Sequence, residues 1–250
     1  MKTLANFRFM LIIILSITLS ACQSTPSTTP TDTAAPTAQV GQTGPCANPY
    51  FPVIEGATWA YSGNTDVGGD FTRTITISDV GTDAFLVEWV SDPLTGVTTW
   101  TCTPEGLVED QSNGGIFSSV LTGPDATVTV QNLSNTGVTL PANPQTGDSW
   151  MQVSELSATT SEGEVLTGTL TIEFSAAGME SISVPAGTFN GLRIDVHAEA
   201  AYQQSGYSST LIWDGTEWLA PGVGRVKATG VMSEPVGFTY EAILESYSIP

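Results

Sequence analysis

Few side chains in this sequence combine the types and spacing that catalysis or metal binding requires. The only histidine among the 250 residues is His197. It shares the polar face of an expected strand with Arg193, Asp195 and Glu199. A zinc site usually takes several His or Cys ligands, and acid–base catalysis requires positioned groups with suitable pKa values. We therefore expect no catalytic residue, no metal site and no cofactor, and we interpret the protein as a non-enzyme.

Pairs of acidic residues are the main alternative to that interpretation. Two carboxyl groups at the right separation hydrolyse glycosides, and carboxylates around a glycine-containing loop hold calcium. With 25 acidic residues in the chain, close pairs also arise by chance. The pairs nearest to these patterns are Glu162 with Glu164 and Asp214 with Glu217 for hydrolysis, and Asp66 with Asp70 for calcium.

Two tryptophans give a stronger signal for binding. The segment 213–218 reads WDGTEW, so Trp213 and Trp218 stand at the ends of an expected four-residue turn. Facing each other across a hairpin, they would form an aromatic pair. Aromatic side chains are frequent anchors at interfaces. We expect Trp213 and Trp218 to mark a site for a glycan, protein or lipid ligand, with packing inside the sheet as the alternative.

The first 22 residues carry a chemical signal of another kind. Lys2 and Arg8 precede an apolar run over 9–19, and Cys22 directly follows Leu-Ser-Ala at 19–21. This arrangement resembles the lipobox of bacterial lipoproteins. The resemblance implies a signal peptide over 1–21, cleavage before Cys22, and attachment of acyl chains such as palmitate to that residue. An uncleaved membrane helix is the alternative, but it needs about 20 apolar residues.

The lipid on Cys22 makes a membrane the first expected partner. No second apolar run of spanning length follows, so we expect the mature chain to lie outside the cytoplasm. Gln23, which stands where Asp would favour retention at the inner membrane, favours the outer membrane of a two-membrane bacterium. In a bacterium with one membrane, the protein would lie on the outer face of the cell.

The two remaining cysteines, Cys46 and Cys102, are an even pair in an oxidising compartment, so we expect a disulfide between them. Two free thiols are the alternative. Residues 22–45 comprise the lipidated cysteine and a tether rich in Thr, Ser and Pro, which cannot bury enough apolar surface to order itself. Residues 46–250 then form a single extracytoplasmic domain.

Net charge narrows the list of partners. The whole chain carries −19, and nucleic acid binding depends on Lys and Arg that neutralise phosphates. We therefore expect no nucleic acid partner. A strongly acidic surface favours solubility in a crowded environment.

Hydrophobic alternation with a period of two recurs along the domain and predicts half-buried strands. Turn signals such as Gly68-Gly69, Asp92-Pro93, Asp214-Gly215 and Pro221-Gly222 separate the expected strands. Only residues 152–161 are arguable as a helix. The alternating segments are 71–77, 85–89, 126–133, 165–174, 192–199 and 238–245. The sequence predicts an all-β, mostly antiparallel fold, either a curved sheet or half-barrel or a two-sheet sandwich.

Three further segments resemble the TapB-like family of secreted bacterial proteins. They are YFPVIEGATWAY at 50–61, VPAGTF at 184–189 and WLAPGVGRVK at 218–227, where Leu219 and Arg225 depart from the family pattern. The resemblance implies an antiparallel β fold, related to the curved half-barrel of the lipoprotein carriers LolA and LolB. It implies no enzyme activity.

These observations lead to a membrane-anchored extracytoplasmic lipoprotein, most simply a non-catalytic binding or structural module. The alternative function is a carrier of the LolA or LolB type, which holds an acyl chain in the concave face of its sheet. The alternation with Thr, Gln and Glu favours the first interpretation, because a carrier needs more apolar surface and a lid.

Overall fold

The computed structural model describes residues 44–112, 128–160, 163–204, 207–234 and 237–250. The chain divides into two units, Met1–Asp32 and Thr33–Pro250, and every described residue belongs to the second. The signal peptide, Cys22 and nearly all of the tether lie outside the described residues, so their boundaries stay predictions.

The described residues form thirteen strands and no helix, which confirms the all-β prediction. The arguable segment 152–161 is strand rather than helix up to Thr160. The strands are β1 (Thr58–Thr65), β2 (Gly69–Ser78), β3 (Ala84–Ser91), β4 (Leu94–Cys102), β5 (Gly106–Glu109), β6 (Val128–Gly137), β7 (Leu140–Pro141), β8 (Ser149–Thr160), β9 (Val165–Val184), β10 (Gly187–Gln204), β11 (Tyr207–Ala220), β12 (Gly224–Glu234) and β13 (Phe238–Ser248). Among the residues that the structure describes, no helix is long and apolar enough to cross a membrane.

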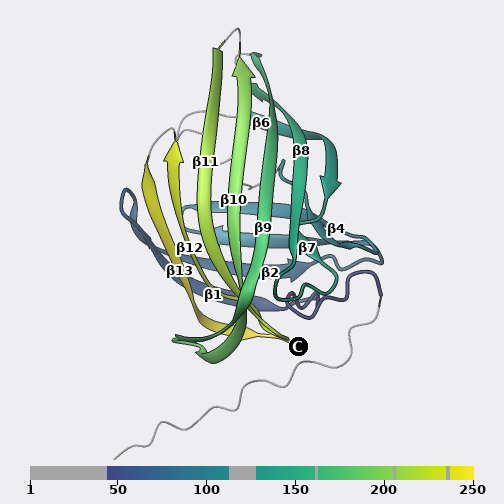
Figure 1. Ribbon diagram of the computed structural model, residues 1–250, viewed down its shortest axis with the longest axis vertical. Coiled ribbons are helices and arrows are strands. Elements are labelled where there is room, and N and C mark those ends of the chain that lie inside the picture. Colours follow the sequence, from purple (N-terminus) through teal and green to yellow (C-terminus); the bar gives the residue numbers. More distant parts are fainter. Residues whose placement is uncertain (1–43, 113–127, 161–162, 205–206, 235–236) are drawn as a thin grey trace, which may run out of the picture. The chain divides into compact units, whose positions relative to one another are not determined.

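All thirteen strands belong to one sheet, in the order β6-β8-β9-β10-β11-β12-β13-β1-β2-β3-β4-β5-β7. Every pairing is antiparallel, and β1 meets β13 directly, with Thr58 opposite Ser248. The architecture is therefore the single curved sheet, and the two-sheet sandwich is wrong. Figure 1 shows the near-vertical β9 to β11 in front, with β1, β2 and β4 running across behind them.

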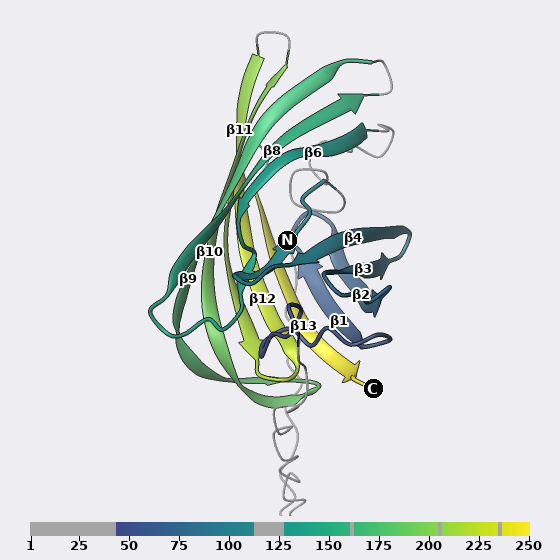
Figure 2. The same ribbon diagram turned by 90° about the vertical axis from the view of Figure 1, so that its right-hand side faces the viewer.

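The sheet bends strongly enough to face itself, and Figure 2 shows the long curved strands β9 to β11 on one side and β1 to β4 on the other. Register shifts interrupt the ladders at Ala60/Tyr61, Arg193/Ile194 and Trp218/Leu219. An extra residue at such a point bends its strand and increases the local twist. We call the face that carries the buried side chains the inner face, and the opposite one the outer face.

Two apolar clusters fill the inner face. The first lies between the two sides of the bent sheet and includes Trp59, Phe85, Trp100, Leu192 and Leu244. The second lies along β8 to β12 and includes Leu156, Leu170, Ala198, Leu211 and Met232. The alternation read from the sequence therefore places the correct residues inside.

Two segments far apart in the sequence, 49–61 and 222–225, are hydrogen-bonded to each other beside the first cluster. Trp59 Nε1 donates to the carbonyl oxygen of Val223 at 2.6 Å, and the Tyr61 hydroxyl donates to that of Arg225 at 2.8 Å. The amide of Gly222 donates to the carbonyl of Pro49. The segment 49–61 and the segment 222–225 are therefore held together by hydrogen bonds, which gives both of them a structural role.

Cys46 and Cys102 form a disulfide that spans 56 residues of sequence. It fixes the segment before β1 to the end of β4, beside the buried Leu107 of β5. In the chain-entropy model, a cross-link closing a loop of this size stabilises the folded state by about 4 kcal/mol.

Candidate functional site

The expected tryptophan hairpin is wrong. Asp214 and Gly215 lie inside β11, which runs without a turn from Tyr207 to Ala220. Trp213 and Trp218 are five residues apart in one strand, so their side chains point to opposite faces. They do not form a pair, and each has to be considered separately.

Trp218 lies on the outer face among charged side chains. Its Nε1 donates to Glu180 at 2.8 Å, and the Lys227 ammonium lies 5.7 Å from its ring centroid. Arg193 stands directly opposite it on β10. These contacts account for Trp218 as part of the outer surface of the sheet.

Trp213 lies on the inner face, over two paired glycines. A Cβ atom on Gly230 would lie 2.1 Å from the Trp213 ring, and one on Gly215 would lie 2.8 Å from its Nε1. The ring therefore occupies space that any other residue at these positions would fill. Its centroid lies 6.0 Å from that of Phe238 and 5.8 Å from that of Tyr240.

Trp213 begins a line of half-buried rings that crosses the inner face. Tyr240 stacks on Phe71 of β2 at a centroid distance of 5.6 Å. Arg73 connects Phe71 to Trp89, because its Cζ lies 5.7 Å and 5.4 Å from their ring centroids. We call these rings the aromatic row; its members are Trp213, Phe238, Tyr240, Phe71 and Trp89, and all five remain partly exposed.

Arg73 is a cation without an ionic partner. The described residues give it no hydrogen bond or ion pair, and its Nε is buried without an acceptor. Burial lowers the pKa of Arg73, and the nearby charge of Arg225 lowers it further. The surrounding rings supply cation–π attraction, but no described residue accepts a hydrogen bond from the buried Nε.

Arg225, on β12, is a paired cation on the same face. Its Nη1 donates to Glu217 Oε1 at 2.8 Å, and its Cζ lies 5.7 Å from the Tyr61 ring centroid. The two side chains keep 30% and 33% of their surface exposed, so solvent reaches this part of the inner face. Burial acts to lower the pKa of Arg225, but the charge of Glu217 helps to shift it upward overall.

A polar network on β5 and β8 adjoins these groups. Burial raises the pKa of Glu109 to about 7, although its hydrogen bond from Gln111 and the charge of Arg225 oppose the shift. The buried Gln152 donates to the Glu109 carbonyl at 2.8 Å and accepts from Thr139.

We define the inner-face site as the aromatic row together with Arg73, Arg225, Glu217 and Glu109. The sequence interpretation missed it, although one signal was present. Arg73 has the same parity as Phe71, Ile75 and Ile77 in its strand, and Glu217 has the same parity as Trp213 and Leu219. A charge on the apolar face of an alternating strand is the pattern that marks this site.

A groove of about 690 Å³ lies elsewhere, on the outer side of β8 to β11. Its lining includes His197, whose Nδ1 donates to Asp214 Oδ1 at 2.7 Å. This hydrogen bond raises the pKa of His197. Among the described contacts of His197, no hydroxyl group bonds to the ring, so the groove presents an imidazole–carboxylate pair without a nucleophile aligned to it.

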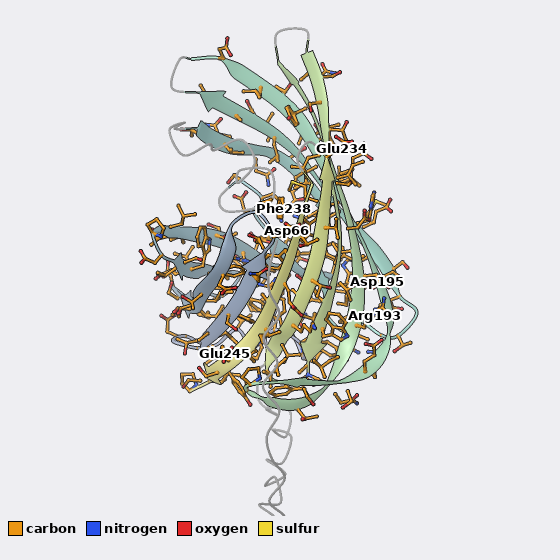
Figure 3. The ribbon with its side chains drawn as sticks, turned by 90° about the vertical axis from the view of Figure 1, so that its left-hand side faces the viewer. Asp66, Arg193, Asp195, Glu234, Phe238 and Glu245 are labelled. Atoms are coloured by element: carbon orange, nitrogen blue, oxygen red, sulfur yellow. A yellow bond between two sulfur atoms is a disulfide. The ribbon has the colours of Figure 1, made fainter. Side chains whose placement is uncertain are left out.

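The carboxylate pairs do not assemble into the sites considered for them. Asp214 bonds to His197 on the outer face, whereas Glu217 bonds to Arg225 on the inner face. Asp70 accepts from Asn64, and Asp66 accepts from the Thr239 amide at 2.8 Å. Figure 3 shows Asp66 close to Phe238 at the start of β13, and Arg193 beside Asp195 on β10.

The remaining pair cannot be placed, since Glu162 lies outside the described residues. Within the ranges that the structure covers, no group of three or more His, Cys, Asp or Glu side chains is placed to hold a metal ion.

Two solved structures share this fold. One is a candidate lipoprotein from Parabacteroides distasonis, 18% identical, with a TM-score of 0.50 over 81% of this chain and 99% of that one. The other is a candidate exported protein with a YmcC-like fold from Bacteroides fragilis, 16% identical, with a TM-score of 0.51 over 82% of this chain and 100% of that one. At such low identity these likenesses show the fold alone.

Family membership comes from the sequence itself. No curated protein gives a significant match, and the resemblance to the TapB-like family and the relation to LolA and LolB stay predictions. A model of the DUF3108-like family matches residues 102–230, from the end of β4 into β12. Because that match covers more than half of this chain, the chain belongs to the DUF3108-like family.

Proposed function

We propose that this protein is a non-catalytic, lipid-anchored binding protein of the cell envelope, and that its ligand lies on the inner face of the curved sheet. The observation that carries the proposal is the aromatic row together with Arg73, which lies between its Phe71 and Trp89 rings. Five rings stay partly exposed on the face that elsewhere buries its apolar side chains, and the cation among them has no described ionic partner.

Anchoring through Cys22 rests on the arrangement of positive residues, apolar run and Leu-Ser-Ala before that cysteine. The solved structures of similar fold are described as a candidate lipoprotein and a candidate exported protein, which is consistent with a location outside the cytoplasm. The outer membrane, or the outer face of a single membrane, is the proposed address.

Binding is favoured over catalysis because titratable groups that could act as an acid or a base are paired with one another. Glu217 is paired with Arg225, and His197 is paired with Asp214. A ring-lined surface with a cation that the described residues leave without an ionic partner suits recognition, in which aromatic and Arg side chains are common anchors.

The carrier alternative places an acyl chain in the concave face. Its natural lining would be the second apolar cluster, but Leu156, Leu170 and Ala198 are fully buried there. A chain would have to displace their present neighbours, whereas the aromatic row offers surface that is already accessible. The structure therefore favours the row as the place of contact for a glycan, protein or lipid.

The test is photo-crosslinking in living cells. Benzoylphenylalanine replaces Phe238 in the aromatic row, or Val97, which is 46% exposed and lies on the outer face of β4, in the full chain. Irradiation should give a defined adduct, identified by mass spectrometry, from position 238 and not from position 97. Equal labelling at both positions, or none at position 238, would contradict the proposal.

A further inference from the structure

We propose that Arg73 anchors an oxyanion, a carboxylate or a phosphate, carried by a ligand whose apolar part lies along the aromatic row. This inference rests on the proposed function and specifies the chemistry of its ligand. It follows from the distribution of positive charge, the environment of the guanidinium and the neutrality of its surroundings.

Positive charge is scarce in this protein, and three of the four cations that the structure describes are paired. Of the six Lys and Arg residues, four follow residue 43. Arg193 bonds to Asp195 at 2.9 Å, Lys227 to Glu241 at 2.7 Å, and Arg225 to Glu217 at 2.8 Å. Arg73 is the exception among these four, although acidic residues outnumber Lys and Arg by 25 to six.

Among the described residues no carboxylate pairs with Arg73, although this residue lies in a partly desolvated environment. A buried charge is expensive unless it is paired or hydrogen-bonded. The flanking Phe71 and Trp89 rings offset part of that cost and exclude water from one part of the group. An arriving anion would supply the acceptor that the buried Nε lacks among the described residues.

The chemical class of the ligand follows from the shape of the donor. A guanidinium presents planar, forked donors that match a carboxylate or phosphate in bidentate geometry. Arg225 contributes no net charge, since Glu217 neutralises it. The site as a whole therefore suits one anionic group, and the adjoining rings suit an apolar chain or ring attached to it.

The experiment compares probes that share one tail and differ in the head group. The mature chain from residue 22 onward, produced without the signal peptide and carrying Cys22→Ser, has neither the apolar run nor the lipid and needs no detergent. It is titrated with dodecanoate, dodecyl phosphate and dodecanol below their aggregation limits. Tryptophan fluorescence reports binding, because Trp89 and Trp213 belong to the row. Acetate and inorganic phosphate, without a tail, show whether the anion alone is sufficient.

We expect the two anionic amphiphiles to bind at least tenfold more tightly than dodecanol. Arg73→Met should reduce their affinity to that of dodecanol and leave dodecanol unchanged, while Arg73→Lys should retain part of the preference. Arg193→Met, which removes an equal charge from the outer face, is the matched control and should change nothing. Circular dichroism establishes that each variant is folded.

Equal affinity for charged and uncharged probes, or the same loss in Arg193→Met, would overturn the inference. If acetate and inorganic phosphate bind as tightly as the amphiphiles, the oxyanion site is supported and the claim that an apolar tail lies along the aromatic row is overturned. If none of these probes binds while the adduct at position 238 forms, the oxyanion inference fails and the proposed function stands. If that adduct is also absent, both fail.

Discussion

Glu109 shows how strongly burial changes the pKa of a single carboxyl group. Its side chain lies near the cations and anions of the inner-face site, and burial raises its pKa from 4.5 to about 7. Desolvation disfavours the charged form, so the folded protein holds a proton that the unfolded chain releases at lower pH.

This difference predicts a pH-dependent stability. Between pH 4.5 and 7 the native state binds more protons at Glu109 than the unfolded state does, so its contribution to the free energy of unfolding falls as pH rises. The effect is at most about 1.4 kcal/mol for each unit of pKa shift. Denaturant titrations at several pH values should show a shallower decline in Glu109→Gln than in the wild type.

The matched control is Glu105→Gln, which alters an exposed carboxyl near the same strand and should keep the wild-type slope. His197 contributes a slope of the same sign above pH 6.5, since its pKa is also raised. Measurements below that pH separate the two groups. Identical slopes for wild type and Glu109→Gln would refute the assignment.

At the scale of the strands, three aromatic rings lie directly over glycines of neighbouring strands. Phe71 covers Gly63, Trp89 covers Gly96, and Trp213 covers Gly230. Gly63 and Gly96 stand opposite Phe71 and Trp89 in the ladders. A glycine in a strand often marks such a close approach, and these glycines determine where the rings of the row lie.

Replacement of these glycines should therefore be costly. In Gly230→Ala the new methyl would lie 2.1 Å from a Trp213 carbon, so the ring or the strand has to move. Overpacking of this kind typically costs about 1–3 kcal/mol. Gly191→Ala, also inside a strand, meets its neighbours at 3.5 Å or more and should be tolerated. Thermal unfolding of both variants tests this, and equal melting temperatures would contradict it.

The sequence predicts the strands well, because the alternation of segments such as 85–89 and 238–245 reports which face is buried. It predicts the site poorly for two physical reasons. Asp214-Gly215 looks like a turn, yet Gly215 is there to leave room for Trp213. Arg73 looks like one polar residue among threonines, and only the long-range pairing of β2 with β1 and β3 shows that it lies among rings.

At the scale of the whole molecule, the main electrostatic feature is the excess of acidic residues. The chain is strongly acidic, with a net charge of −19, while two of the four cations after residue 43, Arg73 and Arg225, lie on the inner face. A strongly acidic chain repels anions in solution, so the proposed anionic ligand would gain no long-range attraction from the net charge.

The proposed anchor makes a prediction at this scale. Cys22→Ala should abolish labelling by radioactive palmitate and should yield either a larger, unprocessed precursor or protein that leaves the detergent phase. The reason is that acyl chains contribute about 0.8 kcal/mol for each buried methylene group. Detergent-phase partitioning and the mass of the product measure this, with Ser24→Ala as control. A Cys22→Ala product that keeps both the palmitate label and the wild-type mass would reject the anchor.

The pairing of β1 with β13 also has a consequence for the order of folding. Strands β1 to β5 and β8 to β13 are two meanders whose neighbouring strands are close in sequence, and local pairings of that kind close quickly. The ladder between them, with Thr58 opposite Ser248, has to wait until β13 is available. A nascent chain that stops before β13 would expose unpaired edges on both β1 and β12, and such edges recruit strands from other molecules. Pairing of β13 with both of these strands is thus the step that covers the two edges.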